Sequence, residues 1–181
     1  MRAGLPLLAL AIEACCCYLV SIGDFRSQVP RFWTGFFFAF LCYAVAAWLV
    51  LRRSQDSLLL ILGAALAFRL TLWWSPPTLS DDIFRYVWDG RVQLAGINPY
   101  LHPPSSPEIA HMRDALHGLV NHADIPTIYP PLAQLFFRLV CALSATPHAL
   151  KFALLLCDFG LCLLLVRSLI QHGQDPRRVL L

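Results

Sequence analysis

The sequence predicts an all-α fold: a polytopic bundle of about five transmembrane helices, with an extracytoplasmic loop of amphipathic interfacial helices. Two observations support this fold class. The chain is 58% hydrophobic and only 14% charged, and it contains several apolar runs close to the length of about twenty residues that crosses about 30 Å of hydrocarbon. The net charge of +3 is small and scattered, so it does not indicate binding to nucleic acid.

Hydropathy places the predicted spans in chain order and divides the chain into three parts. The spans are residues 3–22, 32–51, 58–74, 132–143 or a little beyond, and 150–170. Residues 1–74 therefore hold the first three transmembrane helices, and residues 132–181 hold two more. Between them, residues 75–131 form one long polar loop, which carries the candidate chemistry.

The first span and the positive charges predict the topology. Arg2 and the small residues at the end of the span are typical of a signal peptide, but the apolar run is longer than usual and no A-x-A site follows, which favours a retained signal anchor. Arg2 with the pair Arg52 and Arg53 predicts a cytoplasmic amino terminus and an outside loop. Arg177 and Arg178 then lie outside, against the rule, but early charges usually dominate insertion.

The cysteines do not indicate a metal site or a disulfide framework. None of the seven lies in the long loop, and no C-x-x-C pair occurs. We expect them to behave as small buried hydrophobic residues. They are Cys15, Cys16, Cys17, Cys42, Cys141, Cys157 and Cys162.

The loop opens with a predicted amphipathic helix over residues 81–95. Ser80 is a suitable N-cap, and Asp81 and Asp82 fill the first turn, where the helix dipole favours anions. Gly96, followed by Ile97, predicts a Schellman ending. The apolar side holds Ile83, Phe84, Val87, Trp88, Leu94 and Ala95, and the polar side holds Asp82, Arg85, Tyr86, Asp89 and Gln93. Such a helix is expected to lie along the membrane surface.

A second helix is predicted from Ser105 or Ser106 to about Asn121, with Pro107 in its first turn. Its expected buried stripe is Ile109, Met112, Leu116, Leu119 and Val120, while His111, Arg113, Asp114 and His117 face elsewhere. The stretch NHADIPTIYPP that follows contains three prolines and predicts an ordered, non-helical loop.

Each charged residue near the start of the first loop helix has a plain structural explanation. Acidic residues in a first turn contribute about 0.3–1 kcal/mol each. An i,i+4 pair between Arg85 and Asp89 contributes about 0.2–0.5 kcal/mol. These explanations do not account for the combination, in which adjacent aspartates begin a surface helix just after a membrane span. A base at that depth is what a reaction between a lipid-phosphate donor and a polar acceptor requires.

The stretches SDDIFRYVWDGRVQLAGINPY and NHADIPTIYPPLAQLFF, set between membrane spans, resemble the GT-C superfamily of integral membrane glycosyltransferases. Within it they are similar to the bacterial polyprenol-phosphate-mannose-dependent mannosyltransferases. The resemblance implies transfer of a hexose, mannose in this branch, from a polyprenyl-phosphate donor to an envelope glycan or glycolipid acceptor. It places the reaction on the outer side of a bacterial-type inner membrane. The absence of a nucleotide-binding motif agrees with a lipid-linked donor.

The resemblance also implies roles for individual residues. Asp81 is the expected general base, and Asp82 either assists it or holds a divalent cation. Guanidinium groups suit phosphate oxygens, so three arginines are candidates for the donor phosphate: Arg69, Arg85 and Arg91. The remaining loop positions, expected to face or shape the acceptor site, are Tyr86, Asp89, Asn98, Tyr100, His122 and Tyr129.

Ionisable residues inside the apolar runs are a separate observation. Glu13, Arg69 and Asp158 each cost about 2.5–3.5 kcal/mol or more in a membrane, so each marks a functional site or a structural pair between helices. A Glu13–Arg69 contact is one candidate for such a pair. The spacing of His111 and His117 does not form a tight metal-ligand set, and any metal site is expected at Asp81 and Asp82.

Several alternatives stay open at this point. Members of the superfamily generally have more spans than this chain, so the chain is expected to be an amino-terminal piece of a longer enzyme, a subunit completed by a partner, or an inactive remnant. A transporter or lipid-carrier flippase is a rival function, although inverted repeats and broken helices are not visible. A noncatalytic membrane subunit is another.

Overall fold

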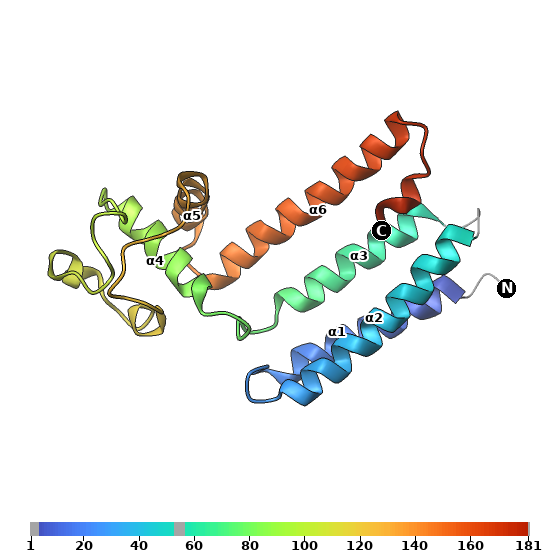
Figure 1. The fold of residues 1–181 in the computed structure, drawn as a ribbon, viewed down its shortest axis with the longest axis horizontal. Helices are drawn as coiled ribbons and strands as arrows, with labels where there is room; N and C mark the ends of the chain where they lie inside the picture. The colour runs from blue at the N-terminus through green and yellow to red at the C-terminus, as the bar shows by residue number, and fades with distance from the viewer. Residues whose placement is uncertain (1–3, 53–56, 181) are drawn as a thin grey trace. The chain divides into compact units, whose positions relative to one another are not determined.

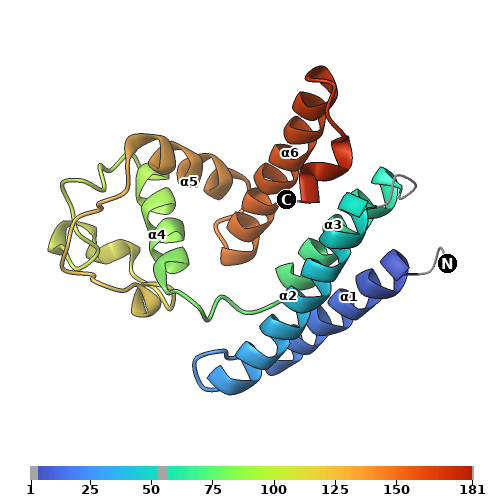
Figure 2. The ribbon, with the colours of Figure 1, turned by 45° about the vertical axis from the view of Figure 1, so that its right-hand side comes forward.

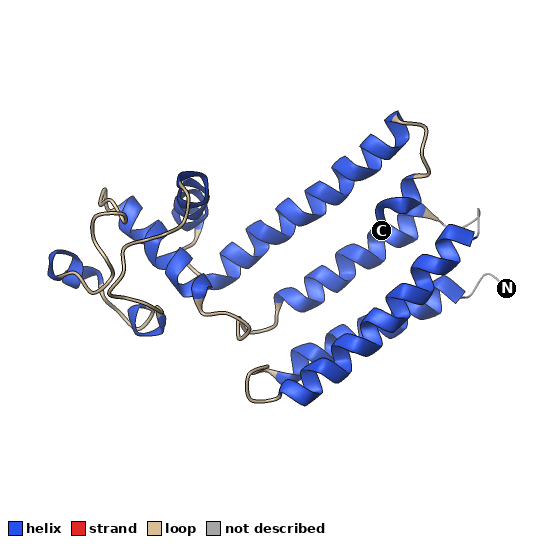
Figure 3. Cartoon of the chain, viewed as in Figure 1, coloured by secondary structure: helices blue, strands red, loops and turns tan. Residues whose placement is uncertain are grey.

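The protein is all-helical, which confirms the predicted fold class. The computed structural model describes residues 4–52 and 57–180, and within them every regular element is an α-helix or a 3-10 helix (Figure 3). The elements are α1 (Gly4–Ile22), α2 (Val29–Arg52), α3 (Leu58–Trp73), α4 (Asp82–Leu94), η1 (Pro107–Met112), η2 (His117–Leu119), α5 (Pro131–Leu143), α6 (Pro147–Gln171) and η3 (Pro176–Leu180). Arg2, Ala3, Arg53 and Leu181, on which parts of the span and topology predictions rest, lie outside the described residues.

All of the predicted spans are helices, but they differ in length. α1, α2 and α6 have 19, 24 and 25 residues and are long and apolar enough to cross a membrane. α3 and α5 have 16 and 13 residues. A helix of 13 residues covers about 20 Å, less than the hydrocarbon thickness of about 30 Å. α5 packs against α4 instead.

The chain divides into two compact units. The first unit comprises Met1–Pro76 and Leu155–Leu181, and the second comprises Pro77–Leu154. In the first unit, α1 and α2 lie side by side, joined by a turn at Gly23, and α3 packs on α1 (Figures 1 and 2). Apolar residues from these helices form its buried cluster: Leu5, Ala46, Val50 and Ile61.

The outward surface of α2 is strongly apolar and aromatic. Trp33 stacks on Phe37 with ring centroids 5.2 Å apart, and Phe36 stacks on Phe40 at 6.4 Å. All four rings are exposed. A water-soluble protein rarely exposes such a continuous apolar surface, so this face suits contact with lipid chains. Together with the long apolar helices, it makes this a membrane protein.

The second unit is organised around α4, whose ends agree closely with the prediction. Asp81 takes the N-cap position, one residue later than expected, and the Asp82 N–H donates to Ser80 Oγ at 3.2 Å. At the other end, Gly96 has φ +77°, and the Ile97 N–H donates to the Val92 carbonyl at 3.1 Å. This is the predicted Schellman ending, in which glycine adopts the left-handed conformation without strain.

The polar side of α4 is buried within the second unit, whereas an amphipathic surface helix would turn its polar side outward. Arg85 is 5% exposed and Asp89 1% exposed. Gln134 of α5 and the loop at residues 121–127 supply their hydrogen-bond partners. The opposite side packs into a cluster made of Trp88, Val92, Ile109 and Val120. Both sides of α4 are therefore buried.

The predicted second loop helix is wrong. The segment forms the short helices η1 and η2, and Arg113 between them is extended. Asp114 Oδ1 accepts the N–H groups of Leu116 at 3.0 Å and His117 at 3.3 Å, so a side chain takes the place of helical carbonyls. Leu119, expected to be buried, is 53% exposed. The stretch from Asn121 to Pro130 is non-helical, as predicted.

The close approach of α4 and α5 depends on Gly90. A Cβ atom there would lie 2.5 Å from Cys141 Sγ and 2.7 Å from the Phe137 carbonyl oxygen. We therefore expect Gly90→Ala to lower stability by about 1–3 kcal/mol, the usual cost of overpacking, as measured by thermal unfolding of the purified protein. Gly118→Ala is the control, because a Cβ atom there meets nothing within 4 Å. Equal unfolding temperatures for the two variants would contradict this packing.

Candidate functional site

A pocket of about 400 Å³ lies in the second unit between the start of α4 and the loop that precedes α5. Its lining is polar on the α4 side and mixed on the loop side: Asp82, Arg85, Asn121, His122, Ile125, Pro126, Ile128 and Tyr129. The lining joins the two sequence stretches that carry the family resemblance. Four of the predicted site residues, Asp82, Arg85, His122 and Tyr129, are among these residues.

Arg85 connects the loop at residues 121–127 to α4 through hydrogen bonds. Its Nε donates to Asp89 Oδ1 at 2.9 Å, which confirms the predicted i,i+4 pair. Its Nη1 and Nη2 donate to the carbonyl oxygens of His122 at 3.3 Å and Ile125 at 2.9 Å. The guanidinium group thus uses its planar fork to bind three groups of its own unit, and its charge is matched by Asp89.

A buried network continues from Asp89 to α5. Gln134 Nε2 donates to Asp89 Oδ2 and to Thr127 Oγ1, each at 2.7 Å. Gln93 Nε2 donates to Gln134 Oε1 at 2.6 Å. Both carboxylate oxygens of Asp89 are therefore bonded inside the protein. Asp89 does not line the pocket, but it is paired with Arg85, which does.

The GINPY and TIYPP stretches hold each other. The Tyr100 hydroxyl donates to the Tyr129 carbonyl oxygen at 2.6 Å, and the Thr127 N–H donates to the Pro99 carbonyl oxygen at 3.2 Å. Asn98 Oδ1 accepts the Tyr100 N–H at 2.9 Å, which forms the turn between them. Asn98 and Tyr100 therefore shape the loop, while Tyr129 lines the pocket.

Two tyrosines meet beside the pocket. The rings of Tyr86 and Tyr129 lie edge to face with centroids 4.8 Å apart, and Tyr86 stacks on Phe137 at 4.5 Å. Burial raises the pKa of Tyr129, and the nearby Tyr86 and Asp82 raise it further. Burial also raises the pKa of Tyr86. Both phenols therefore stay protonated at neutral pH and keep their capacity to donate a hydrogen bond.

The two predicted catalytic aspartates occupy different places. Asp82 lines the pocket, and its Oδ1 accepts a hydrogen bond from Asn121 Nδ2 at 2.8 Å. Asp81 is the N-cap residue of α4 and is not among the lining residues. Among the described residues no group of three His, Cys, Asp or Glu side chains could hold a metal ion. A divalent cation here would be held by the adjacent Asp81 and Asp82 carboxylates, with oxygen ligands from water or substrate completing its coordination.

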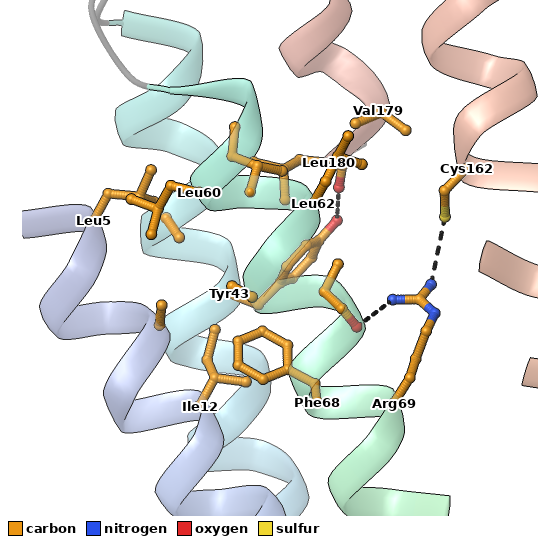
Figure 4. A pocket seen from close by; sticks show the side chains of 15 residues that line it. Leu5, Ile12, Tyr43, Leu60, Leu62, Phe68, Arg69, Cys162, Val179 and Leu180 are labelled. Carbon is orange, nitrogen blue, oxygen red and sulfur yellow. Dashed lines mark hydrogen bonds between the residues drawn. The ribbon is translucent and has the colours of Figure 1, made fainter. Parts of the chain in front are cut away.

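The other two candidate arginines are also paired. Arg91 Nη1 lies 2.8 Å from Asp114 Oδ2 at the surface, with side chains 27% and 47% exposed. In the first unit Arg69 forms an ion pair with Asp158 and donates to the Ala65 carbonyl oxygen at 2.9 Å. It borders a largely apolar cavity of about 210 Å³ between the helices (Figure 4).

The Glu13–Arg69 pair that the sequence suggested is not formed. Glu13 Oε1 accepts a hydrogen bond from the Thr71 hydroxyl. Arg69 therefore forms a structural ion pair between helices, but its partner is Asp158 and not Glu13. Sequence reasoning also assigned no role to Asn121 or Gln134, because their contacts lie 39 and 45 residues away and leave no local pattern.

The chain matches a protein-family model over most of its length. Residues 19–180 match the model of the MptA_B family, described as alpha-(1->6)-mannopyranosyltransferase, N-terminal domain. The match spans most of the 181 residues, including every helix that contributes to the pocket. No match was found among the curated proteins or among the solved structures.

The buried Arg85–Asp89 pair should be far more important for stability than the surface Arg91–Asp114 pair. We expect Arg85→Gln to cost about 3–5 kcal/mol in thermal or denaturant unfolding, because it leaves the Asp89 carboxylate buried without its cation. Arg91→Gln should cost about 0–1 kcal/mol. Similar costs for the two variants would show that the Arg85 network is not formed.

The Arg69–Asp158 pair gives a second expectation. Asp158→Leu should lower the thermal midpoint of the detergent-purified protein, because Arg69 then loses its carboxylate partner in an apolar region. Replacing both residues with leucine should restore part of the loss, since no unpaired charge remains. A double variant that is less stable than either single variant would contradict this pairing.

Proposed function

Because this chain belongs to the MptA_B family of alpha-(1->6)-mannopyranosyltransferases, we propose that it transfers mannose from a polyprenyl phosphate to a glycan or glycolipid acceptor. The family match makes it a glycosyltransferase domain, and the apolar helices make it a membrane protein. The matched model describes an N-terminal domain, so catalysis is proposed for the natural protein that contains this chain. We place the reaction on the outer side of a bacterial-type inner membrane.

The lipid-linked donor is supported by the protein's setting and by its sequence. Asp82 follows the end of α3 at Trp73 by nine residues, so the acidic pair comes soon after an apolar helix. A donor anchored in the bilayer would present its phosphate and sugar near the headgroups. The sequence contains no G-x-x-x-x-G-K-[ST] or G-x-G-x-x-G motif for a nucleotide sugar.

The pocket suits a hydroxyl-bearing acceptor. Its charged lining groups are Asp82 and Arg85, and Asp89 already neutralises Arg85. The unmatched negative charge repels a phosphate but accepts a hydrogen bond from a sugar hydroxyl. Tyr129 adds an aromatic surface and a phenol group at the same pocket. These groups favour the acceptor over the donor phosphate as the occupant.

In the proposed reaction a carboxylate of the acidic pair accepts the proton of an acceptor hydroxyl as its oxygen attacks the anomeric carbon of mannose. The bond between that carbon and the phosphate oxygen breaks, and polyprenyl phosphate leaves with the electron pair. Attack from the opposite face inverts the configuration. Family resemblance assigns the base role to Asp81, whereas the pocket geometry favours Asp82 because it lines the pocket.

The donor phosphate needs a cation, and each of the three candidate arginines has a carboxylate partner. Exchanging that partner is costly for Arg85, whose guanidinium is buried and also holds the loop. It costs less for Arg91, whose pair with Asp114 is partly exposed at the surface of the second unit. Arg69 lies in the apolar helix α3 beside an apolar cavity, where an unpaired charge costs more. We therefore propose Arg91 as the first of the three to test for phosphate binding, and Arg85 as a residue that supports the pocket.

The presence of Asp82 in the pocket carries this proposal, and its replacement tests it. We expect Asp82→Asn to reduce mannosyl transfer at least about 100-fold, the usual contribution of a general base. The assay would use the full natural protein, a synthetic polyprenyl-phosphate mannose and a short α-mannoside acceptor, with the new linkage identified by NMR. A nucleoside diphosphate mannose in parallel tests the donor class.

Two further variants show which aspartate is the base and whether the effect is specific to the pocket. Asp81→Asn shows whether the first aspartate is the base that the resemblance implies. Asp124→Asn makes the same chemical change at an exposed residue of the same loop that does not line the pocket, and it should keep normal activity. Wild-type rates in both Asp81→Asn and Asp82→Asn would exclude the acidic pair from the chemistry.

A further inference from the structure

Asn121 is the one described residue that bonds the Asp82 side chain. Its Nδ2 donates to Asp82 Oδ1 at 2.8 Å, and this contact joins the start of α4 to the loop wall 39 residues away. Among the described residues, no donor contacts Asp82 Oδ2 within hydrogen-bond distance. One carboxylate oxygen is therefore held by the protein, and the other is available in a pocket that both residues line.

The position of the Asn121 amide is fixed from both sides. The preceding residue, Val120, is buried in the apolar cluster with Trp88. The following residue, His122, has φ +47°, a left-handed conformation that costs a non-glycine residue roughly 1–2 kcal/mol. Its carbonyl oxygen accepts hydrogen bonds from Arg85 Nη1 at 3.3 Å and from the Ile125 N–H at 3.1 Å, and these bonds hold the strained conformation.

The chemistry of the amide also matters. A lysine or arginine at this position would pair with the Asp82 carboxylate and reduce its capacity as a base. A neutral amide fixes the carboxylate orientation and leaves its negative charge in place. The pocket then combines a matched ion pair, Arg85 with Asp89, and an oriented carboxylate that keeps its charge.

We propose that Asn121 is a positioning residue that orients the Asp82 carboxylate toward the acceptor hydroxyl. This role rests on the proposed function, in which Asp82 contacts the acceptor. Asn121 itself does not need to touch the substrate. Its effect on the reaction passes through Asp82, so its loss should matter only while the Asp82 carboxylate is present.

A kinetic double-mutant cycle tests the proposal on the full natural protein, with the polyprenyl-phosphate mannose and α-mannoside assay. Asn121→Leu keeps a side chain of similar size without a donor or a charge, and Asn121→Ala removes the amide. We expect each to lower kcat by about 10-fold to 100-fold, the cost of misplacing a reacting group, with KM for both substrates little changed. In an Asp82→Asn background, Asn121→Ala should lower kcat no further.

A second measurement tests whether the Asp82 and Asn121 side chains interact in the folded protein. Thermal midpoints of Asp82→Ala, Asn121→Ala and the double variant should be non-additive if the two side chains interact. His111→Ala, an exposed change in the same loop, should leave both kcat and the midpoint unchanged. Additive midpoints, an unchanged kcat in the Asn121 variants, or a further kcat loss on top of Asp82→Asn would each overturn the positioning role.

The proposed function itself is tested separately within the same experiment. If the wild-type protein transfers no mannose from either donor, the proposed function fails, and the role of Asn121 fails with it. If the wild type transfers mannose and only the Asn121 expectations are not met, the proposed function stands and the positioning role does not. The two failures are therefore distinguished by the wild-type rate.

Discussion

The second unit depends on the interactions of one buried guanidinium group, that of Arg85. The group is paired with Asp89, and it donates to two loop carbonyls 37 and 40 residues away. A buried cation is costly unless it is paired and hydrogen-bonded, so this group favours the arrangement in which the loop carbonyls lie beside it on α4. That arrangement holds His122 in its left-handed conformation and sets the wall of the pocket.

The two units contribute different physical properties to one proposed reaction. The first unit offers long apolar helices and an aromatic outer surface, which suit a lipid bilayer and a lipid-linked substrate. The second offers a pocket whose polar groups come from the start of α4 and from the loop before α5, and hydrogen bonds join the two. Precise transfer of mannose from a lipid phosphate to an acceptor hydroxyl requires reactive groups that are held in fixed positions.

Local features of the site could be predicted from the sequence, whereas its long-range contacts could not. The ends of α4 follow from the nearby Ser80 and Gly96, and the Arg85–Asp89 pair follows from helical spacing. The burial of that pair was missed because its covering residues come from α5 and the loop. The predicted helix over residues 105–121 failed because Asp114 bonds its own backbone. The role proposed for Asn121 depends on a contact with a residue 39 positions away, which sequence periodicity cannot predict.

Photoaffinity labelling would test most directly the central claim that a sugar acceptor binds in the pocket beside Asp82. An α-mannoside carrying a diazirine group would be irradiated with the full natural protein, and the labelled residues would be mapped by mass spectrometry. We expect labelling of the loop wall at His122, Ile125 or Tyr129, suppressed by excess unlabelled mannoside. Saturable labelling confined to other parts of the protein would contradict it.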